Sequence, residues 1–541
     1  MLSFESNRSP VLGRRGMVAS SQPLATQAGL QILGRGGNAA DAAVATAAAL
    51  NVTEPNMTGI GGDAFSLYFD AASRQVTALN GSGRTPKALT IERLARDGIT
   101  TNIPLYHAHS ITVPGACAAW FDLVARHGRL EMPEILKPAI HLAQEGFPVE
   151  PITARLWAAS LEQVQRSPAG SAFMIDGRAP HPGELFRNPD LAHTFQRVAE
   201  GGAKAFYEGE IAEAIAATAQ SFGGTLGEDD LAQHESTWDQ PISTAYRGLR
   251  LWECPPNGQG LAALLALNIL SGFDLTNQDP LGAQRFHLMI EAMRLAFEDA
   301  RWYVADPRHA STPHIPLDQL LSEDYASVRR KEINPNRAAQ DPRRGAPTAS
   351  SDTVYLCCVD ADGNACSFIN SNYMSFGSGL VPPGFGFTLQ NRAQNMRIDR
   401  THPDAVAPGK RPYHTIIPAL LTREADGQLY GPMGVMGGFM QPQGHLQVTV
   451  AMAEDGCDPQ AALDRPRFGL MAGRGAGEVS VESGLPADTQ EELRTLGHDL
   501  KEVRGLGRIA FGRGQIIRRD TNGVVWGGSD PRADGCAMAE L

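Results

Sequence analysis

The stretch GAPTASSDTVYLCCVDADGNACSF, residues 345–368, changes character near its midpoint. Its first half is small and polar and contains a proline, which is typical of a loose connecting segment. Its second half alternates like a strand, turns at Asp-Ala-Asp-Gly-Asn and continues as another apolar run. The pattern predicts a β-hairpin with strands at 353–359 and 365–369. Thr353 is then the first residue of a core strand, at the exit of a linker.

The segment that leads to this hairpin, residues 331–352, contains three prolines, three arginines and few large apolar residues. Such a composition predicts an exposed, mobile connection. The sequence after it is rich in strand patterns and in glycine.

The overall composition excludes several classes of protein. The chain has 541 residues, of which 42% are hydrophobic and 20% charged, as in ordinary globular proteins. A net charge of −12 argues against a nucleic-acid partner, which usually calls for a basic face. The most apolar early stretch, residues 39–52, is too short to span a bilayer and carries Asp41, so no membrane partner is predicted.

The cysteines and the N-terminus predict a cytoplasmic location. Seven cysteines form an odd set without a C-x-x-C pair, which indicates reduced thiols. Arg14 and Arg15 resemble part of a twin-arginine export signal, but polar residues follow where an apolar run is needed.

Two further stretches predict local structure, and neither of them predicts a bound cofactor. Residues 36–50 are alanine-rich and begin after Gly-Gly, so a helix capped by Asn38 is expected. Residues 59–70, GIGGDAFSLYFD, read as a glycine-rich turn that enters a strand. The lysine of a nucleotide-binding loop is missing from it, and a dinucleotide fingerprint would open a helix instead.

The middle of the chain, about residues 112–310, is expected to be mainly helical. Within it, residues 286–304 have apolar side chains at helical spacing. His287 and Glu291 lie one turn apart there, but the motif H-E-x-x-H is absent. We therefore expect a partly exposed polar pair and predict no metal.

A threonine at the start of a strand becomes a nucleophile if it is also the first residue of a chain. A hydroxyl needs a neighbouring base, and an α-amino group with a pKa of ~7.7–8.0 can supply one. Such an amine at Thr353 requires a cut after Asp352. The Thr353 hydroxyl could make that cut by attacking the Asp352 carbonyl, after which water would open the ester. Taken alone, the junction also fits an ordinary loop that meets a strand.

Several motifs in order along the chain resemble the γ-glutamyltransferase family of N-terminal-nucleophile hydrolases. The matching stretches are GNAADAAVATAAALNVTEP (37–55), GIGGDAF (59–65), VPGACAAW (113–120), PISTAYRGL (241–249), HLMIEA (287–292), DTVYLCCVDADGNA (352–365), FGSG (376–379), KRPYHTIIPAL (410–420) and GVMGG (434–438).

This resemblance implies a four-layer αββα sandwich and a proenzyme that cuts itself between Asp352 and Thr353. The products would be a large subunit, 1–352, and a small subunit, 353–541, whose further assembly into an oligomer stays open. Thr353 would carry the acyl group of a small amide substrate, without a cofactor. Gly437 and Gly438 correspond to the glycines whose N–H groups bind the oxyanion, and Ser371 to a hydroxyl near the nucleophile's amine.

The sequence departs from the family at the residues that bind substrate. Where well-known members have Asn, Gln, Asp and Ser-Ser, this chain has Tyr373, Arg392, Asn395 and His414-Thr415. The family's carboxylate-binding arginine has no aligned counterpart, although Arg84 lies two residues away. The chain between Asn395 and Lys410 is also shorter than in forms that carry a lid over the site.

These changes predict a different acyl group. Loss of a carboxylate and gain of Arg392 remove a grip on an α-ammonium and add attraction for an acid. We expect hydrolysis of a small carboxylate-bearing amide such as oxamate, with hydrolysis favoured over transfer. A dicarboxylic (cephalosporin-type) acylase, a true γ-glutamyltransferase or glutathione hydrolase, an uncut and catalytically silent relative, and a nucleotide or metal enzyme remain as alternatives. Arg392 could also pair with an internal acid and serve only the structure.

Overall fold

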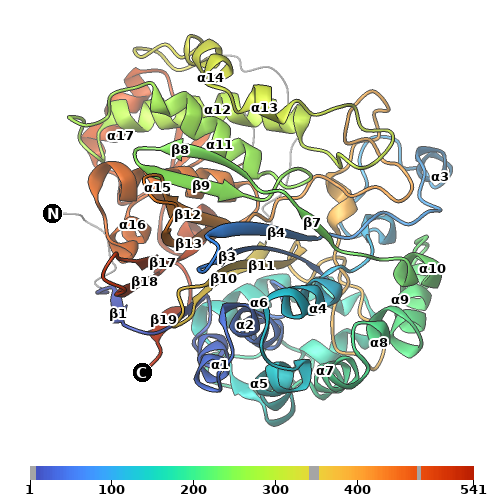
Figure 1. Ribbon diagram of the computed structural model, residues 1–541. Helices are drawn as coiled ribbons and strands as arrows, with labels where there is room; N and C mark the ends of the chain where they lie inside the picture. Colours follow the sequence, from blue (N-terminus) through green and yellow to red (C-terminus); the bar gives the residue numbers. More distant parts are fainter. Residues whose placement is uncertain (1–7, 340–351, 472–476) are drawn as a thin grey trace.

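The computed structural model describes residues 8–339, 352–471 and 477–541. Two seven-stranded antiparallel sheets lie face to face (Figure 1). The first sheet has the order β1 (Val11–Gly13), β18 (Val525–Ser529), β17 (Arg513–Arg519), β13 (Leu429–Met436), β12 (Ala419–Arg423), β9 (Leu249–Glu253) and β8 (Ile242–Tyr246). The second has the order β19 (Cys536–Ala539), β2 (Met17–Ser20), β10 (Asp352–Val359), β11 (Ala365–Tyr373), β3 (Asp63–Asp70), β4 (Gln75–Gly81) and β7 (Thr237–Asp239).

Helices cover the outer face of each sheet (Figure 1). On the second sheet lie α1 (Pro23–Gly34), α2 (Ala39–Thr53), α4 (Ala116–His127), α5 (Met132–Glu145) and α7 (Pro189–Gly201). On the first lie α11 (Gly260–Ser271), α15 (Met440–Asp455) and α16 (Pro459–Asp464). α12 (Ala283–Tyr303) packs on α11 and α15 from outside, and α17 (Ala487–Thr495) packs on α12. The smaller elements are α3 (Ile91–Arg96), α6 (Pro151–Gln165), α8 (Lys204–Tyr207), α9 (Glu210–Ser221), α10 (Glu228–Ala232), α13 (Leu317–Leu320), α14 (Glu323–Arg330), β5 (Phe147–Pro148), β6 (Leu185–Phe186), β14 (Phe468–Gly469), β15 (Val479–Glu482) and β16 (Leu500–Val503).

The buried apolar residues form one core for each interface between layers. Phe65 and Tyr355 of the second sheet meet Leu420 and Ile517 of the first between the sheets. Two larger clusters fill the spaces between each sheet and its helices. Helix, sheet, sheet and helix thus form the four-layer αββα sandwich that was predicted.

The hairpin at the centre of the second sheet is confirmed. β10 pairs antiparallel with β11, which continues to Tyr373, beyond the predicted end at Ile369. The predicted helix after Asn38 is also present as α2. Asn38 accepts hydrogen bonds from the first-turn N–H groups, and every residue of α2 is buried. Its alanines allow close packing on β10 and β11.

The middle of the chain is mainly helical, as predicted, and it also contributes strands β7, β8 and β9, within residues 237–253, to the two sheets. Short alternating strands inside a helical region gave too weak a pattern to be separated from it. The linker prediction falls largely on residues 340–351, which lie outside the described ranges. None of the helices in those ranges is long and apolar enough to cross a membrane.

Candidate active site

A bulge in the central hairpin positions Thr353. The register pairs Asp352 with Tyr373 and Val354 with Asn370, so Thr353 faces two residues of β11. Such bulges reorient side chains and are frequent beside active sites. The Thr353 Oγ1 lies 3.1 Å from the Ser371 Oγ, and both residues are buried.

Tyr373 closes this bulge in an unusual conformation. Its φ is +77°, a left-handed value that is strained for a bulky residue. Its N–H donates a 2.8 Å hydrogen bond to the Ser371 Oγ, which fixes the serine beside Thr353. The strain thus occurs at the residue that holds the two hydroxyl groups together.

Arg392 lies next to the two hydroxyl groups. It begins the short 3₁₀ helix Arg392–Asn395 and is fully buried. Its guanidinium donates to the Ser371 Oγ at 3.2 Å and to the Thr415 Oγ1 at 2.7 Å, and it lies 4.4 Å from the centre of the Tyr373 ring. Within the described ranges it forms no ion pair with a carboxylate. Burial lowers the pKa of Arg392 to about 10, which leaves it a cation at neutral pH.

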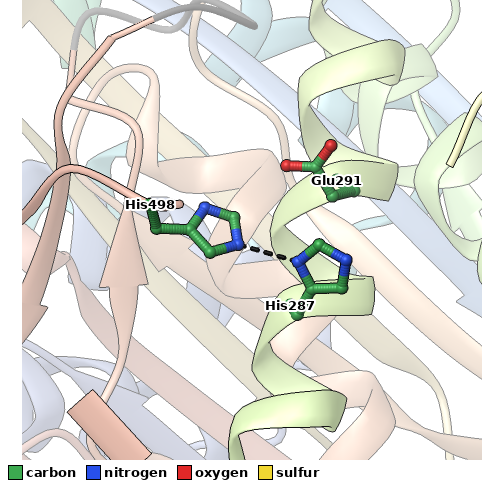
Figure 2. Close-up of side chains that lie close together, drawn as sticks. All are labelled: His287, Glu291 and His498. Atoms are coloured by element: carbon green, nitrogen blue, oxygen red, sulfur yellow. Dashed lines mark hydrogen bonds between the residues drawn. The ribbon is translucent and has the colours of Figure 1, made fainter. Parts of the chain in front are cut away.

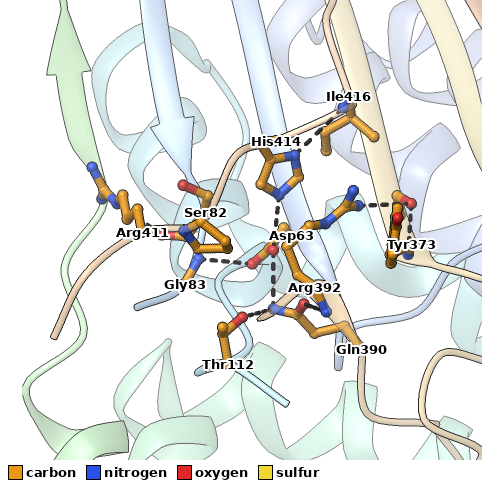
Figure 3. A network of polar contacts seen from close by, with 12 residues as sticks. Asp63, Ser82, Gly83, Thr112, Tyr373, Gln390, Arg392, Arg411, His414 and Ile416 are labelled. Atoms are coloured by element: carbon orange, nitrogen blue, oxygen red, sulfur yellow. Dashed lines mark hydrogen bonds and ion pairs between the residues drawn. The ribbon is translucent and has the colours of Figure 1, made fainter. Parts of the chain in front are cut away.

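Asp63 is the acid whose negative charge offsets that of Arg392, although the described structure shows no hydrogen bond or ion pair between the two side chains. Figure 3 shows its carboxylate between His414, Gln390 and Gly83. The His414 Nε2 and the Gln390 Nε2 each lie 2.9 Å from the Asp63 Oδ2, and the Gly83 N–H donates to the Asp63 Oδ1 at 2.8 Å. The Gln390 Oε1 in turn accepts the Arg392 N–H at 3.0 Å.

The protonation of this network follows from its burial. Burial raises the pKa of Asp63 to about 7, and the charge of Arg392 opposes that shift. Burial and the nearby Arg392 lower the pKa of His414 well below its ordinary value, so its ring is neutral. The His414 Nδ1 faces the Ile416 N–H at 3.4 Å, which assigns the ring proton to Nε2 and makes His414 a donor to Asp63.

The paired glycines lie at the end of β13, before α15. Gly437 has φ +133° and Gly438 has φ +56°, values that favour glycine. In the described part of the structure their N–H groups donate no hydrogen bond, so both can serve a ligand. The Gln259 Nε2 donates to the carbonyl of Gly438 at 2.9 Å and to that of Thr415 at 2.6 Å. A chain of hydrogen bonds therefore runs from Thr353 through Arg392 and Gln259 to the glycine pair.

A pocket adjoins this site on the side of Tyr373. The Tyr373 hydroxyl donates to the Asn395 Oδ1 at 2.6 Å. Asn395 lines the pocket together with Arg301, Arg397, Tyr413 and Phe439, among others. Because Phe439 directly follows Gly438, the pocket begins next to the glycine pair.

Arg84 lies apart from this cluster. Its guanidinium donates to the backbone carbonyl of Glu235 at 3.2 Å, and the residue lines a different pocket with Lys87 and His234. His414, another candidate for substrate binding, has its ring occupied by Asp63. The remaining candidates, Ser371, Tyr373, Arg392, Asn395 and Thr415, are joined to Thr353 by the contacts described above.

Three residues of the network were not singled out from the sequence: Asp63, Gln259 and Gln390. Asp63 had a usable signal, because it is an acid that directly follows a Gly-Gly pair and opens a largely buried strand. Gln259 and Gln390 lie in loops with no periodic pattern. Their roles depend on contacts between residues far apart in the chain.

Two facing antiparallel sheets between helical layers, with a threonine at the start of a central strand, define an N-terminal-nucleophile hydrolase fold. The family model for gamma-glutamyltranspeptidase matches residues 25–540. The chain therefore belongs to the γ-glutamyltranspeptidase family, whose members are hydrolases and transpeptidases.

Individual relatives differ in what they act on. The glutathione hydrolase-like YwrD proenzyme of Bacillus subtilis (strain 168) is 38% identical over 534 residues, covering 98% of this chain and 99% of the relative. The oxamate amidohydrolase proenzyme of Klebsiella pneumoniae subsp. pneumoniae is 33% identical over 532 residues, covering 96% and 98%. The crystal structure of cephalosporin acylase from Bacillus halodurans has a TM-score of 0.92 and 46% identity, covering 99% of this chain and 98% of that one.

Proposed function

We propose that the chain is a self-processing amidohydrolase that cleaves small carboxylate-bearing amides of the oxamate type. Processing begins when the Thr353 Oγ attacks the carbonyl carbon of Asp352 and the peptide nitrogen leaves as the Thr353 amine. Water then hydrolyses the resulting ester. The large subunit ends at Asp352 and the small subunit begins at Thr353.

The same hydroxyl then acts on the substrate. The freed α-amine of Thr353 takes the hydroxyl proton, and Oγ attacks the amide carbonyl. The N–H groups of Gly437 and Gly438 receive the developing oxyanion, where one donor is worth about 3 kcal/mol. The leaving amine takes the proton, and water hydrolyses the acyl ester on Thr353.

The observation that carries the choice of substrate is the position of Arg392. In oxamate the carboxylate is bonded directly to the carbonyl carbon that Thr353 attacks. Arg392 is linked to Thr353 through Ser371 alone, so a carboxylate beside the reacting carbon lies within its reach. A buried guanidinium with no carboxylate partner in the described residues favours an anionic ligand. The 33% identical oxamate amidohydrolase agrees with this choice.

A second candidate is hydrolysis of longer dicarboxylic acyl amides. The pocket beyond Tyr373 carries two arginines, Arg301 and Arg397, and one acid, Asp404, and this excess of cations favours a carboxylate farther from the reacting carbon. A γ-glutamyl group is less favoured, because its α-ammonium would face Arg392. The Asn395 Oδ1, an acceptor that could hold that ammonium, already accepts from Tyr373.

A substrate screen tests the proposal. Ammonia or amine release is measured with oxamate, a glutaryl amide, glutathione and γ-glutamyl-p-nitroanilide. We expect the highest kcat/KM with oxamate. A higher kcat/KM with the glutaryl amide would support hydrolysis of longer dicarboxylic acyl amides instead. Faster turnover of either γ-glutamyl substrate would contradict both.

We also propose that the protein works in the cytoplasm. All seven cysteines are free thiols, which suits a reducing compartment. Fractionation of the producing cells tests this, and recovery of the protein outside the cytoplasmic fraction would contradict it.

A further inference from the structure

Three side chains far from Thr353 in sequence converge at the junction of α12 with the C-terminal region. His287 and Glu291 project from α12, and His498 reaches them from the loop after α17 (Figure 2). One ligand atom from each residue lies within 4.8 Å of the others. All three residues are buried, which corrects the expectation that His287 and Glu291 are partly exposed. His498 and the segment around Asn334 cover them.

The hydrogen bonds fix which nitrogen atoms carry lone pairs. The His287 Nε2 lies 2.8 Å from the carbonyl oxygen of Asn334, which can only accept, so this nitrogen carries the proton. The His287 Nδ1 therefore presents its lone pair to the His498 Nε2, 2.8 Å away. The His498 Nε2 therefore carries the proton of this contact, and each ring can offer one nitrogen to a metal ion in its neutral form.

We infer that His287, Glu291 and His498 form a site for a divalent transition-metal ion of the Zn²⁺ type. Two neutral imidazoles and a carboxylate are a ligand set that Zn²⁺ accepts. The ion would occupy the place of the proton shared by the two rings, and the His498 Nε2 proton would move to Nδ1. Water would fill the fourth position.

The surroundings of the three residues fit this role. The bond from His287 Nε2 to the Asn334 carbonyl is the kind of contact that orients metal-binding histidines. The Ala339 N–H donates to the Glu291 Oε2 at 3.1 Å and steadies the carboxylate. With Zn–N bonds of about 2.0–2.1 Å, the two rings need to separate by roughly half an ångström. The Glu291 carboxylate, whose oxygen lies within 4.8 Å of the ring nitrogens, needs to move toward them.

Arg294 is the competing cation. Its Nε lies 3.2 Å from the Glu291 Oε1, and both residues are buried. A metal ion must therefore share Glu291 with this guanidinium. This competition predicts that Arg294→Gln binds the metal more tightly than the native chain, because a like charge is removed.

The inferred site also joins the two parts of the chain. His287 and Glu291 precede Thr353, and His498 follows it. A bound ion would thus link the two subunits, although the site itself requires no cleavage at Thr353.

Titration calorimetry with ZnCl₂ on tag-free, chelator-dialysed protein tests the inference. We expect one ion per chain, with His498→Gln and Glu291→Gln weakening binding and the loss at His498 on the order of 100-fold. The half-buried His309, which lies outside the cluster, serves as a control, because His309→Gln should bind like the native chain. Circular dichroism checks that each variant is folded.

Two further measurements keep the test decisive. Zn²⁺ should raise the Tm of the native chain and leave that of His498→Gln unchanged, because only binding to the folded state stabilises it. Co²⁺ should give a visible spectrum without the thiolate charge-transfer band that cysteine ligands produce. Three results would overturn the inference: metal binding that persists in His498→Gln, a thiolate band in the Co²⁺ spectrum, or no binding by the native chain. The three residues would then form only a buried hydrogen-bonded contact.

Discussion

The Thr353 hydroxyl lies 3.1 Å from the Ser371 hydroxyl, and Ser371 also accepts from the guanidinium of Arg392. One serine thus connects the proposed nucleophile to the proposed carboxylate-binding cation. Under the proposed function, the reacting group and the group that selects the substrate belong to one buried cluster.

Replacement of Arg392 should separate substrate binding from self-cleavage. Arg392→Gln should lower kcat/KM for oxamate roughly ten- to hundredfold, because a buried charged hydrogen bond is worth ~1.5–3 kcal/mol. Self-cleavage should persist, since it uses the protein's own peptide bond. Steady-state kinetics and a denaturing gel check both expectations.

The matched control for this variant is Arg84→Gln. Arg84 lines a separate pocket, so its loss should change the kcat/KM for oxamate little. An equal loss on oxamate and γ-glutamyl substrates in Arg392→Gln would make Arg392 a structural residue instead.

Asp63 should give anion binding a pH dependence. Its pKa is raised to about 7, so it gains a proton as the pH falls through that value. Loss of its negative charge leaves Arg392 less compensated, and oxalate, a non-reacting anion, should inhibit severalfold more strongly at pH 6 than at pH 8.

Asp63→Asn separates this effect from titration of the Thr353 amine. The variant should lose the step near pH 7 and keep any step from the amine, whose ordinary pKa is ~7.7–8.0. An unchanged inhibition profile in Asp63→Asn would show that Asp63 does not control the charge at Arg392.

Gln259 should affect turnover more than substrate binding. Its amide holds the carbonyls of Gly438 and Thr415, so Gln259→Leu should loosen the oxyanion site and lower kcat about tenfold with little change in KM. Gln460→Leu is the comparison, because Gln460 is equally buried but bonds to Ser529 and Asp464. We expect the two variants to lose similar stability, with the larger loss of kcat in Gln259→Leu. Equal kcat values in the two variants would show that Gln259 does not support the oxyanion site.

Hydrolysis should exceed transfer to an amine. We expect the short connection between Asn395 and Lys410 to form no lid over the site, and a lid is what keeps water from an acyl-enzyme. Addition of a dipeptide acceptor should change the rate of amide cleavage little. A severalfold acceleration with a new peptide product would oppose this expectation.

The sequence was sufficient to predict the parts of the fold that depend on local pattern. The hairpin after residue 352 combines alternation with a turn signal, and α2 combines a capping residue with small side chains. The strands β7 to β9 are short and were hidden in a helical region. Neighbouring strands, rather than their own pattern, stabilise them.

The site was less predictable because its contacts are distant in sequence. The family's motifs placed His414 at a ligand position, and Arg84 was a candidate because it lies two residues from the position of the family's arginine. In the structure His414 bonds to Asp63 and Arg84 to Glu235. These partners lie about 350 and 150 residues away, beyond any local pattern. A change from serine to histidine alters which neighbour the side chain reaches, and only the packed structure reveals that neighbour.

Self-cleavage before Thr353 is tested most directly by the intact mass of the purified protein under denaturing conditions, with N-terminal sequencing and activity measured on the same sample. We expect two chains, 1–352 and 353–541, with the smaller beginning at Thr353. The variant Thr353→Ala should give one inactive chain, since it lacks both the attacking hydroxyl and the freed threonine amine. A fully active, uncut polypeptide of 541 residues would contradict the account.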